Sequence, residues 1–474
     1  MIFNYIEKSV SRKVQLVNIL YCTHVETADS LAIKLNCSPL TILEDINYLQ
    51  ESVKLPIYED AAAKTYYLNP SKNTTLHNYL KQIYQTSIFL NFLEYFLLDD
   101  KPKYSEFIKE QHVSTAKGYR LRDDVAQYLN TIGLSLKKNI VTGSPILIRF
   151  LAVELTRSFG LNLVKMEMKT AELSDTVLIR IEKLLNIKFS AQEYEFYTLL
   201  MQTTLDSNLP CAELALTQTE LRGINSNLYP NEYLAIVRSV FQPYWGERTS
   251  CELSFSILAF IATNSHIFDK SLAPEILANN RAEFLSMPEV KSLIDLISQE
   301  FNVPPEMTDY FYTSIYIFLR DALFRLQPIF SSSYVHLDAD KTSYVSRKLN
   351  KILKDWNVTN LKISEQHINA LYNRLVPILV TNLYKHIYIV SERNIDAGFL
   401  LDYLTTVTQT SKLQIDIISK ITDVSKETLN DPQNLFVVDK DLSSPVQVPG
   451  NNVIYIFFPL SGQQIFRLLR KIFK

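Results

Sequence analysis

The stretch TADSLAIKLNCSPLTILEDINYLQESV (Thr27–Val53) predicts two helices joined by a tight turn at Asn36 and Cys37. Ser38 is placed to cap the second helix, and Pro39 suits its first position because that backbone N–H would lack a partner anyway. Apolar residues recur at helical spacing in both helices and predict a buried face. These inward residues are Leu31, Ala32 and Leu35, followed by Ile42, Ile46, Leu49 and Val53.

A short helix, a turn and a longer helix are typical of the helix-turn-helix, whose second helix enters the major groove of DNA. We expect Thr41, Asn47 and Tyr48 to face outward from that second helix and to contact double-stranded DNA. LPIYEDAAAKTYYLN (Leu55–Asn69) then predicts two short strands around a polar tip, as in a wing. A plain helical hairpin is the alternative interpretation of the two helices alone.

A second copy of the pattern spans about residues 90–148. Tyr104–Gln111 is its expected first helix, and Ser114 caps a longer helix that ends at Gly133. GLSLKKNIVTGSPILI (Gly133–Ile148) is the candidate wing. Gly118 costs this helix about 1 kcal/mol relative to alanine. The predicted inner stripe is Leu121, Val125, Tyr128, Leu129 and Ile132, and the predicted DNA-facing residues are Thr115, Lys117, Tyr119, Arg120, Arg122, Lys137 and Lys138.

Charge distinguishes the two modules. Residues 101–149 carry nine Lys or Arg and four Asp or Glu, a balance of +5, whereas residues 1–100 carry eight and eleven, a balance of −3. The first recognition helix has no Lys or Arg and includes Glu44 and Asp45. Because neutralised phosphates supply much of the affinity for DNA, we expect the second module to dominate binding.

Composition limits the remaining possibilities. A chain of 474 residues predicts three to five domains, and 47% apolar with 21% charged residues indicates a globular protein. Nine glycines favour a mainly helical fold with few phosphate-binding loops. No run of eighteen apolar residues and no cleavable signal is found, so we expect a cytoplasmic protein that does not enter the membrane. The four cysteines lack metal-ligand spacing, and we expect them to be buried and reduced.

The rest of the chain changes from a helical to an alternating pattern at His386. Two helical bundles of about one hundred residues each precede this point. After it, four short β-branched runs alternate with helices and predict a small, mainly parallel α/β domain with a terminal helix at Ser461–Lys474. The expected domains are therefore 1–85 and 86–165 (winged helix-turn-helix), 166–269 and 270–385 (helical bundles), and 386–474 (α/β).

In length and layout, this order resembles the Mga/AtxA-type virulence regulators of Gram-positive bacteria. SLAIKLNCSPLTILEDINYL looks like the first helix-turn-helix of that family, and STAKGYRLRDDVAQYLNTIGL with GSPILIRFLAVEL looks like the second module and its exit helix. The resemblance implies that the bundles are PTS-regulation domains and that the α/β domain is similar to a phosphotransferase EIIB domain. It also implies a transcription regulator, an activator of virulence-type genes, and a phosphocarrier protein as a possible partner.

In that family, histidines of the PTS-regulation domains can be phosphorylated. The corresponding candidates here are His367 and His386, with His336 third, although a packed or surface histidine is the more common situation. EIIB enzymes carry phosphate on a cysteine in the first loop, and Ser391–Gly398 has none. This departure favours an assembly or sensing role for the α/β domain.

Three hypotheses about function follow. The leading one is a transcription regulator that dimerises through its C-terminal half, because paired DNA half-sites require two-fold symmetric proteins. The alternatives are a phosphotransferase-system component and a helical scaffold that does not bind DNA. We find no catalytic set, metal site or cofactor motif, and therefore expect no enzymatic activity.

Overall fold

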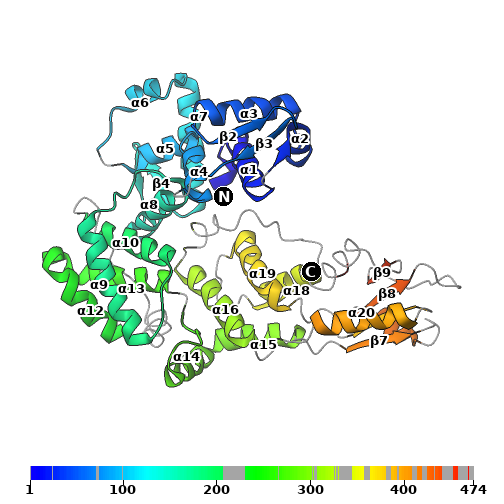
Figure 1. Cartoon of the computed structure of the whole chain (residues 1–474). Coiled ribbons are helices and arrows are strands. Elements are labelled where there is room, and N and C mark those ends of the chain that lie inside the picture. Colours follow the sequence, from blue (N-terminus) through cyan, green and yellow to red (C-terminus); the bar gives the residue numbers. More distant parts are fainter. Residues whose placement is uncertain are drawn as a thin grey trace. The chain divides into compact units, whose positions relative to one another are not determined.

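The computed structural model describes most of the chain in two compact units (Figure 1). Unit 1 comprises Met1–Ile267, Ser271–Ala273 and Asp321–Val335, and unit 2 comprises Phe268–Lys270, Pro274–Arg320 and His336–Lys474. Among the described helices, none combines the length and apolar character needed to cross a membrane. The described residues are 2–23, 25–70, 74–98, 100–206, 230–264, 266–301, 303, 307–324, 326, 329, 344–356, 363–379, 386–391, 394–407, 414–418, 424–431, 433–439, 452–456 and 468.

Unit 1 begins with a winged helix-turn-helix. After the short 3-10 helix η1 (Ile2–Asn4), it contains α1 (Lys8–Thr23), α2 (Ala28–Leu35), α3 (Pro39–Glu51), β1 (Glu26–Thr27), β2 (Ile57–Asp60) and β3 (Thr65–Leu68). The strands pair antiparallel in the order β1-β3-β2. Asn36 adopts the left-handed conformation in the turn, and the Ser38 side chain accepts a hydrogen bond from Thr41 N, so the predicted turn and cap are confirmed. The predicted inner face is buried except at Leu35 and Val53, which are half-buried.

The second module follows the same plan. It contains α4 (Leu76–Tyr84), α5 (Ile88–Leu97), α6 (Tyr104–Glu110), α7 (Thr115–Thr131), β4 (Ser135–Lys137), β5 (Ile140–Thr142) and α8 (Pro145–Phe159). The wing is the antiparallel hairpin of β4 and β5, as predicted. Pro145 already begins α8, so the last part of the segment that we assigned to the wing is helical. All five residues of the predicted inner stripe of α7 and its C-cap are buried.

Gly118 explains how α6 and α7 approach each other. A Cβ atom at this position would lie 2.6 Å from Ile108 Cδ1 and 2.8 Å from Ile108 Cγ1. The close crossing therefore needs a residue without a side chain. Glycine lowers the intrinsic stability of the helix, but its missing side chain leaves the space that Ile108 of α6 occupies.

A helical bundle completes unit 1. Its described helices are α9 (Met168–Leu185), α10 (Ala191–Leu205), α12 (Pro230–Trp245) and α13 (Thr249–Thr263), with the 3-10 helix η2 (Gly246–Arg248) before the last of them. Tyr197 and Tyr233 are fully buried and joined by a 3.0 Å hydroxyl hydrogen bond.

The cysteines differ from the expectation that all four are buried and reduced. Cys251 of α13 is disulfide-bonded, and Cys37 in the turn before α3 is a half-buried free thiol. That expectation is therefore wrong.

Unit 2 contains further helices, followed by the α/β part. The helices are α14 (Pro274–Ser286), α15 (Pro288–Glu300), α16 (Thr308–Leu323, as far as Arg320), α18 (Tyr344–Trp356) and α19 (Glu365–Leu379). The Trp356 indole N–H donates to Glu289 O at 2.8 Å and thereby joins α18 to α15. Together with unit 1, these helices make the chain mainly α-helical, as the sequence predicts.

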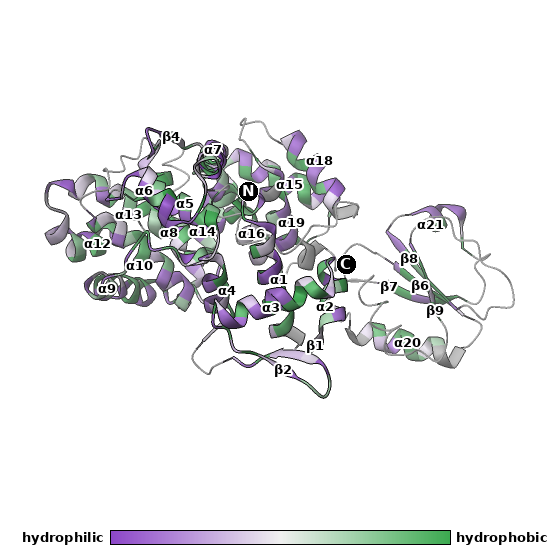
Figure 2. Cartoon of the chain, turned by 90° about the horizontal axis from the view of Figure 1, so that it is seen from above, coloured by the Kyte–Doolittle hydropathy of each residue, from purple (hydrophilic) through white to green (hydrophobic). Residues whose placement is uncertain are grey.

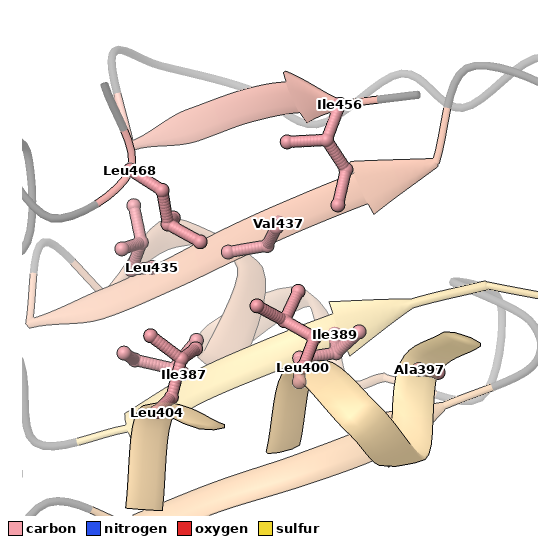
Figure 3. Close-up of a cluster of buried hydrophobic side chains, with 9 residues drawn as sticks. All are labelled: Ile387, Ile389, Ala397, Leu400, Leu404, Leu435, Val437, Ile456 and Leu468. Carbon is pink, nitrogen blue, oxygen red and sulfur yellow. The ribbon is translucent and has the colours of Figure 1, made fainter. Parts of the chain in front are cut away.

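The α/β part is a four-stranded parallel sheet in the order β7-β6-β8-β9. Its elements are β6 (His386–Val390), α20 (Asn394–Val407), β7 (Gln414–Ile418), α21 (Lys426–Asn430), β8 (Asn434–Asp439) and β9 (Val453–Ile456). The central strands are strongly hydrophobic (Figure 2). Figure 3 shows Ile387 and Ile389 of β6 next to Leu435 and Val437 of β8, with α20 alongside. The parallel sheet was predicted, whereas the predicted terminal helix lies outside the described residues apart from Leu468.

Candidate nucleic-acid interface

Helix α7 has one buried face and one solvent-exposed face. Leu121, Val125 and Leu129 are buried on the inner face, where α7 packs on the rest of the module. Thr115, Lys117 and Arg120 are exposed on the outer face, as predicted, and Tyr119 retains 53% of its accessible surface. The exposed face therefore offers cations, a hydroxyl and an aromatic ring to a partner.

Polar contacts fix the start of α7. The Ser114 side chain accepts a hydrogen bond from Lys117 N at 3.3 Å, and the Tyr104 hydroxyl donates to Gly118 O at 2.7 Å. Burial raises the pKa of Tyr104 to about 12, and the nearby Arg122 guanidinium only partly offsets this effect. Tyr104 therefore keeps its proton at physiological pH and holds α6 against α7 as a hydrogen-bond donor.

The wing turn presents two lysines in a defined conformation. Lys138 and Asn139 have positive φ values of 50° and 63°, which two-residue hairpin turns require. Lys101 Nζ donates to Asn139 O at 2.9 Å and to Phe96 O at 3.1 Å, which anchors the turn to the end of α5. Lys137 and Lys138 are both exposed. These two predicted DNA-facing residues therefore project from a short, fixed hairpin.

A groove joins the recognition helix to the wing turn. It has a volume of about 650 Å³ and is open to solvent. Arg122 was predicted to face outward, but it is half-buried, and its Nε atom is buried without a hydrogen-bond partner among the described residues. The lining residues are Tyr104, Ser105, Ile108, Lys109, Val113, Thr115, Tyr119, Arg122, Lys138 and Asn139.

The first module has a different recognition helix. Asp45 of α3 is buried and pairs with Arg12 at 2.5 Å and with Lys13 at 3.3 Å, both from α1. Its charge is therefore neutralised inside the fold. The pairing was missed because α1 carries no helix-turn-helix signal and lies more than thirty residues earlier.

The three predicted contact residues of α3 have different surroundings. Thr41 is half-buried, and its hydroxyl lies 2.8 Å from the Ser38 hydroxyl, so it supports the helix cap. Asn47 is exposed, and Tyr48 is 38% exposed with Lys13 Nζ 4.4 Å from its ring centroid. Leu40 beside them is 66% exposed. This face is more apolar and less cationic than that of α7.

The candidate phosphorylation sites differ in accessibility. His367 is 4% exposed, its ring stacks on Phe318, and its Nε2 lies 2.8 Å from Phe318 O. The His386 side chain is 17% exposed; its Nε2 lies 2.6 Å from Asp416 Oδ2, and its Nδ1 lies 3.2 Å from the Tyr388 hydroxyl. His336 lies outside the described residues.

The first loop of the α/β part is shorter than expected. Asn394 already begins α20, so most of the predicted loop Ser391–Gly398 is helical. Ser391 is buried, and its hydroxyl donates to Asp439 Oδ2 at 3.0 Å.

Within the described part of the chain, no group of three or more His, Cys, Asp or Glu side chains is placed to hold a metal ion.

Comparison with known proteins identifies the second module. No curated protein matches the chain. The family model of the Mga helix-turn-helix domain matches residues 69–155, a range that contains α4 to α7, both strands of the wing and most of α8. The match indicates a DNA-binding transcription regulator and agrees with the resemblance inferred from the sequence. Residues 69–155 are therefore similar to the Mga helix-turn-helix domain.

Proposed function

We propose that this protein regulates transcription by binding double-stranded DNA through the face formed by α7 and the β4–β5 wing. The main support for this proposal is that Tyr119 of α7 and Lys138 of the wing turn line the same groove. The recognition helix and the wing thus share one surface, on which Arg120 and Lys137 are also exposed. A helix in the major groove and a basic wing along the backbone would together contact base edges and phosphates.

The charge distribution supports the second module as the main contact. The exposed cations Lys117, Arg120 and Lys138 have no carboxylate partner among the described residues, whereas Arg12 and Lys13 of the first module are paired with Asp45. Unpaired surface cations can neutralise DNA phosphates without first breaking an internal ion pair. The first module would then orient the protein or contribute weaker contacts through Asn47 and Tyr48.

We further propose that the protein is a cytoplasmic, non-enzymatic activator of virulence-type genes that works as a homodimer. The C-terminal half would supply the dimer contact, and a phosphocarrier protein of the phosphotransferase system would modulate it through histidine phosphorylation. Support comes from the family resemblance and from the two-fold symmetry that paired DNA half-sites require. Light scattering on the full chain, compared with a chain that ends before Ile395, would test the dimer contact.

The DNA-binding proposal is tested by footprinting on genomic fragments, followed by affinity measurements across salt concentrations. Replacing Arg120 by alanine should weaken binding by about 1–3 kcal/mol if it contacts a base edge. Replacing Lys117 should reduce the salt dependence by about one unit of slope if it contacts a phosphate. The matched pair Thr41→Ala and Asn47→Ala should weaken binding less. A larger effect of this pair would assign the main contact to the first module.

A further inference from the structure

The groove beside α7 is lined by several positively charged side chains. Lys109 of α6, Arg122 of α7 and Lys138 of the wing turn all line it, and no Asp or Glu is among the described lining residues. None of these three cations forms an ion pair with another described residue. Three consecutive elements of the chain thus each contribute a positive charge to the lining of one groove.

Arg122 has a buried hydrogen-bond donor without a partner among the described residues. Its side chain is half-buried, and the donor is its Nε atom. Asp123 is the neighbouring carboxylate, yet Arg122 affects the pKa of Tyr104 more strongly than Asp123 does. A buried donor without a partner destabilises the protein, and an acceptor from a ligand would offset this cost.

The remaining walls of the groove suit a sugar attached to an anion. The Tyr104 ring is fixed because its hydroxyl donates to Gly118 O, and the Tyr119 ring lies 6.0 Å from it in an edge-on arrangement. Thr115 lies at the first position of the seventeen-residue helix α7, where the helix dipole also favours an anion. The volume of about 650 Å³ exceeds the space that a bare phosphate needs and is typical of small-molecule sites.

We propose that this groove binds a sugar phosphate, with Arg122 as the central contact to the phosphate and with Lys109 and Lys138 beside it. The inference deepens the proposed function, because the sugar-phosphate backbone of bound DNA offers this chemistry. A free sugar phosphate offers the same groups and would compete with DNA for the groove. In either case Arg122 binds phosphate, whereas the exposed Arg120 is available for base edges.

The first experiment measures binding of ribose 5-phosphate to the full chain by calorimetry, with ribose and inorganic phosphate as reference probes. Arg122→Gln should weaken ribose 5-phosphate binding by roughly tenfold or more, since a charged hydrogen bond is lost. Lys138→Gln should also weaken it. The matched controls Arg120→Gln and Lys137→Gln lie on the same helix and hairpin but outside the groove, and should bind the probe as the wild type does.

The second experiment measures the salt dependence of binding to a footprinted DNA fragment. Arg122→Gln should lower the slope of log K against log salt by about 0.9, the value for one phosphate contact. Arg122→Lys should retain most of that slope, because it keeps the charge. The melting temperature of each variant shows that it is folded, and the exposed Lys138→Gln provides a second variant that leaves the packing intact.

The two experiments separate the possible outcomes. A reduced DNA slope without ribose 5-phosphate binding supports the groove and identifies DNA as the source of the phosphate. Arg122-dependent probe binding without any DNA binding supports the groove and overturns the proposed function. If the wild type binds DNA, and the Arg122 and Lys138 variants match it in both measurements, the groove proposal fails alone. Absence of both activities in the wild type overturns both proposals.

Discussion

Arg149 and Glu252 form a fully buried, bidentate ion pair between helices α8 and α13. Arg149 Nη1 donates to Glu252 Oε2 at 2.7 Å and Nη2 donates to Oε1 at 3.0 Å, with side-chain exposures of 1% and 0%. Because α8 directly follows the wing hairpin and α13 belongs to the helical bundle, the pair joins the DNA-binding module to the bundle within unit 1. Phe255 also packs against the Arg149 guanidinium.

Removing one partner of this pair should be far more costly than removing both. Arg149→Met leaves Glu252 with Arg248 as its other described partner, and should lower the free energy of unfolding by about 3–5 kcal/mol. The double variant Arg149→Met/Glu252→Leu should recover most of this loss, since no buried charge remains unpaired. Denaturant unfolding of Arg149→Met, Glu252→Leu, the double variant and the wild type measures the coupling. Equal losses in the single and double variants would contradict this account.

Gly118→Ala should destabilise the second module although alanine favours helices. The added Cβ would lie 2.6 Å from Ile108 Cδ1, and the expected strain of about 1–3 kcal/mol exceeds the propensity gain of about 1 kcal/mol. Combining Gly118→Ala with Ile108→Ala should cost less than the sum of the two single changes, because the new methyl group then occupies vacated space. Thermal unfolding tests this, and strictly additive losses would show that the two residues do not compete for space.

Glu94→Gln should stabilise the protein at neutral pH. Burial raises the pKa of Glu94 above its ordinary value of 4.5, although its Oε1 accepts a hydrogen bond from Asn162 N. Because the folded-state pKa is raised, the contribution of Glu94 to stability is fully present below pH 4.5 and is lost as the pH rises through the folded pKa. Glutamine keeps the acceptor without the charge. Unfolding at pH 7 and pH 4 should show a gain only at pH 7, whereas Glu94→Ala, which loses the acceptor, should show none.

Local patterns predicted both helix-turn-helix units, because caps, turns and apolar spacing are properties of short segments. Ser38 and Ser114 cap their helices as expected, and the buried stripe of α7 is correct. The parallel sheet was predicted for the same reason, since its β-branched runs are distinct from the helical pattern before them. The role of Gly118 was not predicted, because its neighbour Ile108 comes from a different helix.

The groove could not be predicted from sequence, because it requires residues that lie up to thirty-five positions apart along the chain. Tyr104, Arg122 and Lys138 come together only when α6, α7 and the wing pack around the same core. Arg122 was expected on the exposed face by helical spacing alone, and the position of α6 accounts for its partial burial. The pairing of Asp45 with Arg12 was missed for the same reason, since ion pairs between distant helices leave no periodic signal.

Of the two described histidines that we expect to be candidates for phosphorylation, His386 has the more suitable geometry. We expect the Asp416 carboxylate to hold a proton on Nε2 at 2.6 Å, which leaves Nδ1 with a lone pair toward the Tyr388 hydroxyl at 3.2 Å. Nδ1 would then be the acceptor of a phosphoryl group. His367 is less suitable because it is buried and its Nε2 contacts Phe318 O.

Incubation with the general phosphotransferase proteins and phosphoenolpyruvate should therefore place acid-labile phosphate on His386. The label should be absent in His386→Ala, reduced in Asp416→Ala, which loses the group that fixes the tautomer, and unchanged in His367→Ala. The added phosphate carries about two negative charges, so it should also alter packing around β6 and β7 and shift the proposed dimer equilibrium, as measured by light scattering. A wild-type protein that takes up no label would rule out phosphorylation, and label retained in His386→Ala would move the site to another histidine.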